Sequence, residues 1–365
     1  MTKRIVAIAF IFACSTVAWM LLGASIFART ETADSLLKGR VSSTWGADQQ
    51  QQPPTASYDK VEPRVEVTLV EGKKNERRFE QHSEVPLPLE SSRINVGLDL
   101  DHRQKGLLWY STYTVAFTGA YGFRNPSEKD EQVTFTLNFP ASQAIYDDLV
   151  MEVDGQPLPT TNQKIATVGK MLVPAGKTAV LKVGYRSQGL DAWRYGFGDE
   201  VAQMRDFNLR MSTNFKRIDF PENTLSPTEK RETAQGWELV WNYRNLVSGF
   251  QIAMPMPEKL QPGPLAGRIS LFAPVSLFFF FFLMFIITTL RNIELHPMNY
   301  FFLSAAFFSF HLLLAYLVDH IQIHTAFVVC SLVSMFLVIS YLRLVTGMRF
   351  AAALWLPTSK YSMAR

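Results

Sequence analysis

The sequence predicts a membrane protein of mixed class, in which α-helical transmembrane segments accompany a large extracytoplasmic, antiparallel β-rich domain with a sandwich-like arrangement. Three features predict it. Long apolar runs without charge stand near both ends of the chain, and the region between them is polar and punctuated by Pro and Gly. In that region apolar and polar residues alternate with the period of two that is typical of half-buried strands.

Four runs are long enough to cross a bilayer. A hydrocarbon core of about 30 Å requires roughly 20 apolar residues in a helix, and the four runs are residues 5–27, 269–290, 299–318 and 325–342. They predict an N-terminal transmembrane anchor in residues 1–28 and three transmembrane helices in residues 269–346. A cleaved signal peptide is the alternative for the first run. We favour an uncleaved anchor, because a signal core is shorter and residues 25–28 lack small residues at both cleavage positions.

The basic residues that flank these runs predict the orientation of the chain, since Lys and Arg are enriched in cytoplasmic loops. Lys3 and Arg4 precede the first run, which places the N-terminus in the cytoplasm and residues 63–268 outside. The loop of residues 319–324 has no Lys or Arg and is expected outside. The remaining basic flanks are expected inside: Arg291, Arg343, Arg349, Lys360 and Arg365.

The middle of the chain is predicted to hold a linker, residues 29–62, followed by the β-rich domain, residues 63–268. The Gln-rich stretch 49–52 and the two Pro that follow it favour an extended, mobile linker. Alternation predicts strands at residues 65–70, 132–139, 178–185 and 207–215, and turn signals fall at 154–155, 174–176 and 196–199. Pro255, Pro257, Pro262 and Pro264 predict a stiff connector to the second membrane helix.

Residues 237–257 also alternate and contain Trp237, Trp241 and Tyr243. Two interpretations are open. The aromatic rings can fill the core from a central strand, or they can form a stacking platform for a glycan or peptide. We favour the core, because aromatic stripes usually serve packing.

Several classes of function are disfavoured by the composition and by missing motifs. A net charge of +4 without a basic, aromatic-interleaved stripe argues against nucleic acid. The only two cysteines, Cys14 and Cys330, fall in apolar runs, so the β-rich domain is not a disulfide scaffold. No phosphate-binding loop, dinucleotide fingerprint, nucleophile elbow or zinc-protease motif occurs. The adjacent carboxylates at 147–148 and 199–200 are interpreted as solvated turns. We therefore expect no enzyme, catalytic residue or cofactor.

The histidines give two weaker hypotheses. Asp319, His320 and His324 are weak candidates for a metal site, because two His four residues apart share one face of a helix. Polar residues at the end of a membrane helix are the plainer explanation, and we expect no metal. His311 lies near the middle of an apolar run, where ionisable groups are costly. We expect a neutral His311 that ties helices together, bonded to Ser309 or to a neighbouring helix.

Several short segments follow a known pattern: residues 295–302, 310–316 and 319–320 at the third run, and residues 45–46, 220–228 and 237–241 upstream. In these segments the sequence resembles the CreD family of inner-membrane proteins. The resemblance covers most of the chain from Trp45 to Phe350. It implies a multi-pass protein of the cell inner (plasma) membrane, a role in cell-envelope integrity or the envelope-stress response, and no known catalytic residues. The implied partners are the lipid bilayer and other envelope membrane proteins.

The chain departs from the family pattern after Arg349. Family members continue with further membrane helices, whereas here residues 350–356 form a short apolar piece that cannot span a bilayer. We expect residues 347–365 to form a short interfacial segment and a basic cytoplasmic tail, as in a C-terminally truncated member.

The alternative function is a ligand-sensing membrane receptor component that acts through a partner protein, because no cytoplasmic output domain is predicted. A transporter is disfavoured by the absence of midplane charges, and an enzyme comes last.

Overall fold

The computed structural model describes residues 2–70, 73–105, 108–142, 144–198, 202–290 and 295–346. They divide into two compact units, each described by itself below. The helical unit comprises Met1–Leu37, Gly106–Leu108 and Leu260–Arg365. The β unit comprises Lys38–Lys105 and Trp109–Lys259.

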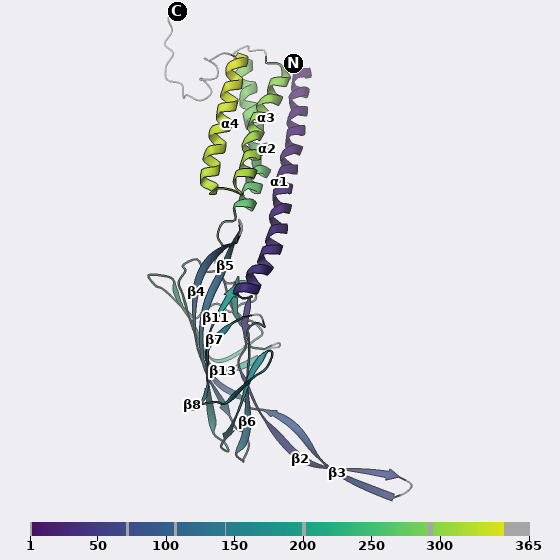
Figure 1. The fold of residues 1–365 in the computed structure, drawn as a ribbon, viewed down its shortest axis with the longest axis vertical. Helices are drawn as coiled ribbons and strands as arrows, with labels where there is room; N and C mark the ends of the chain where they lie inside the picture. The colour runs from purple at the N-terminus through teal and green to yellow at the C-terminus, as the bar shows by residue number, and fades with distance from the viewer. Residues whose placement is uncertain are drawn as a thin grey trace, which may run out of the picture. The chain divides into compact units, whose positions relative to one another are not determined.

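The four predicted spans are confirmed as helices that are long and apolar enough to cross a membrane. They are α1 (Thr2–Trp45), α2 (Pro262–Leu290), α3 (Pro297–Leu317) and α4 (Ile323–Thr346) (Figure 1). Helix α2 begins earlier than predicted, because Pro262 and Pro264 stand in its first turn, where a missing N–H has no partner to lose. The connector predicted there is therefore partly helix.

Among the described residues of the helical unit, side chains from all four helices form the larger of two apolar clusters, and the smaller one includes Leu314 and Cys330. Trp19, Phe281, Tyr300 and Leu342 are among the buried members of the larger cluster. Polar side chains pair between helices: the hydroxyls of Ser304 and Ser15 lie 2.6 Å apart, Ser334 donates to the Ala306 carbonyl at 3.1 Å, and Tyr341 donates to Asn299 at 3.0 Å. Such pairing leaves few polar groups to face hydrocarbon.

The predicted linker of residues 29–62 is wrong for this fold. Helix α1 continues without interruption to Trp45, β1 occupies Gln49–Gln51, and β2 occupies Thr55–Val70. Helix formation past residue 28 is understandable, because residues 29–41 contain neither Pro nor Gly except Gly39. In the β unit, Lys38 pairs with Asp191 at 2.5 Å, and the Arg103 guanidinium lies 3.3 Å from the centroid of the Trp45 ring.

The β unit contains three sheets. The first has the order β1-β12-β16 and adds β12 (Ala192–Tyr195) and β16 (Ile252–Pro255) to β1. The second has the order β3-β2-β6-β10-β9 and adds β3 (Lys73–Pro86), β6 (Glu131–Asn138), β10 (Ala166–Val173) and β9 (Thr160–Asn162). The third has the order β14-β15-β13-β4-β5-β11-β7-β8, with β14 (Glu229–Glu232), β15 (Trp237–Ser248), β13 (Ala202–Thr213), β4 (Leu89–Lys105), β5 (Leu108–Arg124), β11 (Thr178–Leu190), β7 (Tyr146–Val153) and β8 (Gln156–Pro157).

Antiparallel pairing prevails in these sheets, as expected, although β1 with β12 and β13 with β4 run parallel. The second and third sheets share one core, and the rings of Phe135 on β6 and Phe123 on β5 meet edge to face at 6.0 Å. Strands β2 and β3 form a long two-stranded ribbon whose outer part extends beyond its own sheet (Figure 1).

The predicted strands fall in β2, β6, β11 and β13. The side chains of residues 66–70 lie outside those that the structure describes. The turn signals at Asp154-Gly155 and Gly176 are confirmed, since all three residues adopt positive φ angles of 52°, 79° and 66°. Of the signal at 196–199, residue 199 lies outside the described residues. The predicted limits of the β-rich domain are 63–268. The first strand begins before residue 63, and the last strand ends at Pro255, before residue 268.

Strand β1 brings glutamines into the core. Gln49 and Gln51 are fully buried, and their amides are used: Gln49 donates to Ser187 at 2.8 Å, and Gln51 accepts from the Tyr185 hydroxyl at 2.6 Å. Burial raises the pKa of Tyr185 well above its ordinary value, so the phenol stays protonated and donates. The glutamines are therefore part of the fold of the β unit.

We predict that Gln51→Ala destabilises the protein by about 1–3 kcal/mol, because it leaves the buried Tyr185 hydroxyl without its acceptor. Chemical unfolding of the detergent-purified chain, followed by tryptophan fluorescence, measures it. Gln50→Ala is the matched control, since Gln50 is the exposed residue between the two buried glutamines. Equal stability of the two variants would show that the buried amide contributes nothing.

Candidate functional site

The three weak metal candidates are not brought together. Helix α3 ends at Leu317 and α4 begins at Ile323, so His320 and His324 do not share a helix face, and that basis of the hypothesis is wrong. Asp319 pairs with Arg29 at 2.9 Å, and the His320 ring stacks on Tyr316 at 4.6 Å. Within the described parts of the chain, no group of three or more His, Cys, Asp or Glu is placed to hold a metal ion.

His311 is buried, but the expected bond to Ser309 is wrong. Ser309 donates instead to the Ala306 carbonyl at 2.6 Å. The His311 ring contacts Trp19 of α1 at 5.7 Å between centroids, with an interplanar angle of 90°. It also meets Phe307 and Phe310 at 5.6 and 4.9 Å, and its Nδ1 has no hydrogen-bond partner. His311 thus joins α3 to α1 through ring packing.

We predict that His311→Phe keeps the thermal stability of the protein in detergent, because a phenyl ring preserves these contacts and removes an unpaired polar atom. His311→Ala should lose roughly 2–5 kcal/mol through the cavity that it leaves. Differential scanning fluorimetry measures both, with Ser309→Ala as the control that removes only a local bond. Wild-type stability for His311→Ala would contradict a packing role.

In the aromatic stretch 237–257, Trp241 belongs to the core and not to an exposed stacking platform. Trp241 is fully buried, and its indole N–H donates to the Leu225 carbonyl at 2.8 Å. The stretch is two strands, β15 and β16, which belong to different sheets. The alternation of apolar and polar residues continues through both strands, so it does not predict the break between β15 and β16.

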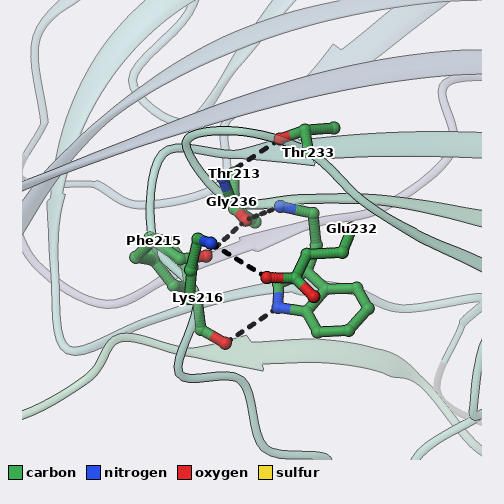
Figure 2. Close-up of polar contacts among 7 residues, drawn as sticks. Thr213, Phe215, Lys216, Glu232, Thr233 and Gly236 are labelled. Atoms are coloured by element: carbon green, nitrogen blue, oxygen red, sulfur yellow. Dashed lines mark hydrogen bonds and ion pairs between the residues drawn. The ribbon is translucent and has the colours of Figure 1, made fainter.

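Trp237, at the start of β15, takes part in a polar network shown in Figure 2. Its backbone N–H donates to the Thr213 hydroxyl at 3.0 Å, and its indole N–H donates to the Lys216 carbonyl at 2.8 Å. The Lys216 ammonium in turn pairs with Glu232 at 2.9 Å. The Thr233 hydroxyl accepts from the backbone N–H of Gly236 at 3.0 Å. The network fastens the β14–β15 hairpin to the end of β13.

Beside this hairpin, the third sheet carries a concave, polar surface that we call the sheet hollow. It consists of two adjoining cavities of about 700 and 440 Å³ that share Asn95 and Arg210. The register of β14, β15, β13 and β4 arranges its side chains in cross-strand rows. The floor is formed by small residues, since Gly97 lies against Ser212 and Ala116.

The next two rows carry the hydrogen-bonding groups of the sheet hollow. Arg210 stands opposite Asn95, and Asn208 stands opposite Arg93 on one side and Asn242 on the other. Arg93 is paired with Asp206 at 2.5 Å. Arg210 is exposed, and its side chain makes no hydrogen bond or ion pair with another described residue. The surface therefore offers an available guanidinium beside amides, a set suited to binding polar or anionic groups.

Sequence patterns alone do not indicate the sheet hollow. The alternation in residues 207–215 predicts β13 and its two faces, but the neighbouring strands come from residues 89–105 and 237–248. The parallel pairing of β13 with β4 has no local signal, because the two strands are more than a hundred residues apart.

The other titratable candidates lie apart from the sheet hollow. Asp147 and Asp148 are exposed but lie in strand β7, so the predicted turn is wrong. Asp148 has a positive φ of 53° and lies 3.6 Å from Arg186, and Asp147 accepts from the Asp148 N–H. Asp199 and Glu200 lie outside the described residues. His82 pairs with Asp59 at 2.6 Å, which raises the pKa of His82. His102 lies 2.8 Å from the Pro257 carbonyl.

Four apolar helices and a large, mainly antiparallel β unit define a membrane protein with a β domain. The family model described as "Inner membrane protein CreD" matches residues 264–358. The match confirms the family resemblance over α2, α3 and α4. Of the matched residues, 291–294 and 347–358, which include Arg291 and Arg349, lie outside those that the structure describes. The predicted interfacial segment and tail also lie outside them.

No curated protein matches the chain in sequence. Among solved structures, a putative nutrient binding protein from Legionella pneumophila is similar, with 10% identity and a TM-score of 0.38 over 57% of this chain and 71% of that one. An M1 zinc metallopeptidase from Deinococcus radiodurans has 11% identity and a TM-score of 0.32 over 47% of this chain and 42% of its own. Both TM-scores are below 0.5, so we take no function from either likeness.

Proposed function

We propose that this chain is a non-enzymatic inner-membrane protein of CreD type, which serves cell-envelope integrity or the envelope-stress response and holds its β unit on the extracytoplasmic side. The observation that supports it most is the CreD match at residues 264–358, because it coincides with three consecutive candidate spans. Membrane context and family resemblance therefore rest on the same residues.

The orientation in this proposal is supported by the basic residues at the helix ends. Lys3 and Arg4 stand at the start of α1, and Arg343 stands in the last turn of α4. The turn between α3 and α4, residues 318–322, contains no Lys or Arg. An even number of spans returns the chain to the side where it began, so the two basic ends share the cytoplasmic side.

The absence of catalysis in this proposal is supported by the chemistry of the sheet hollow. Arginine stays protonated and asparagine does not titrate, so Arg210, Asn95, Asn208 and Asn242 supply no general acid or base. Two carboxylates also line the hollow, Glu229 and Glu238, and Glu238 is held by Arg231 at 2.5 Å. The guanidinium and the amides can bind a ligand but do not transfer its protons.

We predict that a reporter inserted in the β unit is active only outside the cytoplasm. Alkaline phosphatase placed after Gly155, a turn residue with open space around its α-carbon, should be active, whereas a fluorescent protein that folds only in the cytoplasm should stay dark there. The same reporters placed before Lys3 are the control and should give the opposite result. Cytoplasmic signal from residue 155 would overturn the orientation.

We predict that loss of this protein sensitises cells to detergent and to cell-wall antibiotics, because an envelope-integrity protein limits permeability. Survival curves and uptake of a dye that intact envelopes exclude measure the effect. Complementation with the wild-type chain should restore resistance, and complementation with an empty vector should not. Unaltered survival and permeability in the deletion strain would count decisively against the proposed role.

A further inference from the structure

An apolar groove runs between α1 and α2 in the helical unit, and we call it the α1–α2 groove. It has a volume of about 290 Å³, and its walls are Ile5, Ile8, Ala9, Phe12, Phe278, Phe281, Phe282 and Phe285. An enclosed apolar cavity of about 150 Å³ already takes up benzene, so this groove has room for part of a longer hydrocarbon chain.

Aromatic packing keeps the α1–α2 groove open. The rings of Phe278 and Phe282 are parallel at 6.3 Å, and Phe12 meets Phe278 and Phe281 edge to face at 6.0 and 6.5 Å. Ala9 stands on the α1 wall with only a methyl group. Among the larger side chains of the two walls, the small Ala9 leaves a gap that a larger residue at position 9 would fill.

A cationic group stands at one end of the groove. Arg4 directly precedes the wall residue Ile5, and Thr288 follows the wall residue Phe285 by one turn. Arg4 Nη2 lies 3.4 Å from the Thr288 hydroxyl oxygen, a long contact. Its Nε is buried and has no hydrogen-bond partner. The buried Nε is out of reach of a ligand, whereas the terminal Nη1 makes no hydrogen bond with a described residue and retains its donors.

We propose that this groove binds an anionic phospholipid, with one acyl chain between α1 and α2 and the phosphate on the Arg4 guanidinium. Both walls belong to helices of membrane-spanning length and composition, so the solvent that meets the groove is lipid. The planar guanidinium matches the oxygens of a phosphate group. An acyl chain and a phosphate joined in one molecule fit the groove and its cationic end together.

The charge of Arg4 provides the selectivity for an anionic head group, and the groove accommodates the acyl chain. Bulk lipid is as apolar as the phenylalanine walls, so entry of the acyl chain does not by itself favour one lipid over another. A single basic residue near the membrane surface contributes about fivefold in affinity for an anionic lipid. We therefore expect phosphatidylglycerol to bind about fivefold more tightly than phosphatidylcholine with the same acyl chains.

Native mass spectrometry of the full-length protein in detergent, titrated with each of the two lipids, tests the proposal. Arg4→Gln should abolish the fivefold preference, and Arg4→Lys should keep part of it. Lys3→Gln is the matched control: it removes the same charge one residue away, from an exposed side chain that does not line the groove. Ala9→Phe should reduce retention of both lipids by filling the groove. Glycerol phosphate without acyl chains should not compete.

Several results would overturn the site. Equal binding of the two lipids to the wild-type protein would do so without any variant. Equal losses for Lys3→Gln and Arg4→Gln would show general attraction to surface charge. Unchanged retention by Ala9→Phe, or competition by glycerol phosphate alone, would remove the acyl chain from the site. The test is independent of the envelope role, because it measures lipid bound to purified protein.

Discussion

In hydrocarbon, an unpaired backbone N–H or C=O costs several kcal/mol, and this constraint organises the chain. Only a continuous helix satisfies these groups within one segment, and α1, α2, α3 and α4 each supply about 20 or more residues for that purpose. Side chains obey the same constraint. Some hydroxyls of the helical unit find a partner on a neighbouring helix, as Ser304 does with Ser15, and others donate to a carbonyl of their own helix, as Thr16 does to Phe12. The apolar faces that remain either pack together or meet lipid.

Polar groups that are buried in the β unit must also find hydrogen-bond partners, whereas those at its surface can bond to water. The core of this unit is built from aromatic and aliphatic side chains of all three sheets, and hydrogen bonds between side chains pair some of the polar groups that it buries. Gln49 and Gln51 show how: the edge strand β1 places their amides against Ser187 and Tyr185. The Gln-rich stretch is thus buried only because strands from other parts of the chain pair with it and supply partners for its amides.

The character of each candidate site, the sheet hollow and the α1–α2 groove, follows from its surroundings. The sheet hollow is polar because it lies on the outer face of a sheet whose inner face fills the core, and small residues such as Gly97 form its floor. The α1–α2 groove is apolar because both of its helices face lipid. Arg210 in one and Arg4 in the other are the groups with spare donors.

The sequence by itself determined the four spans and the strand character of residues 132–139, 178–185 and 207–215, because length, apolarity and period are local properties. Only the tertiary structure decided how distant strands pair, that residues 29–62 are helix and strand, and that His311 packs against Trp19. These depend on contacts between residues far apart in the chain, which no local window contains. The sheet hollow exists for the same reason, since its rows join strands that are neighbours only after folding.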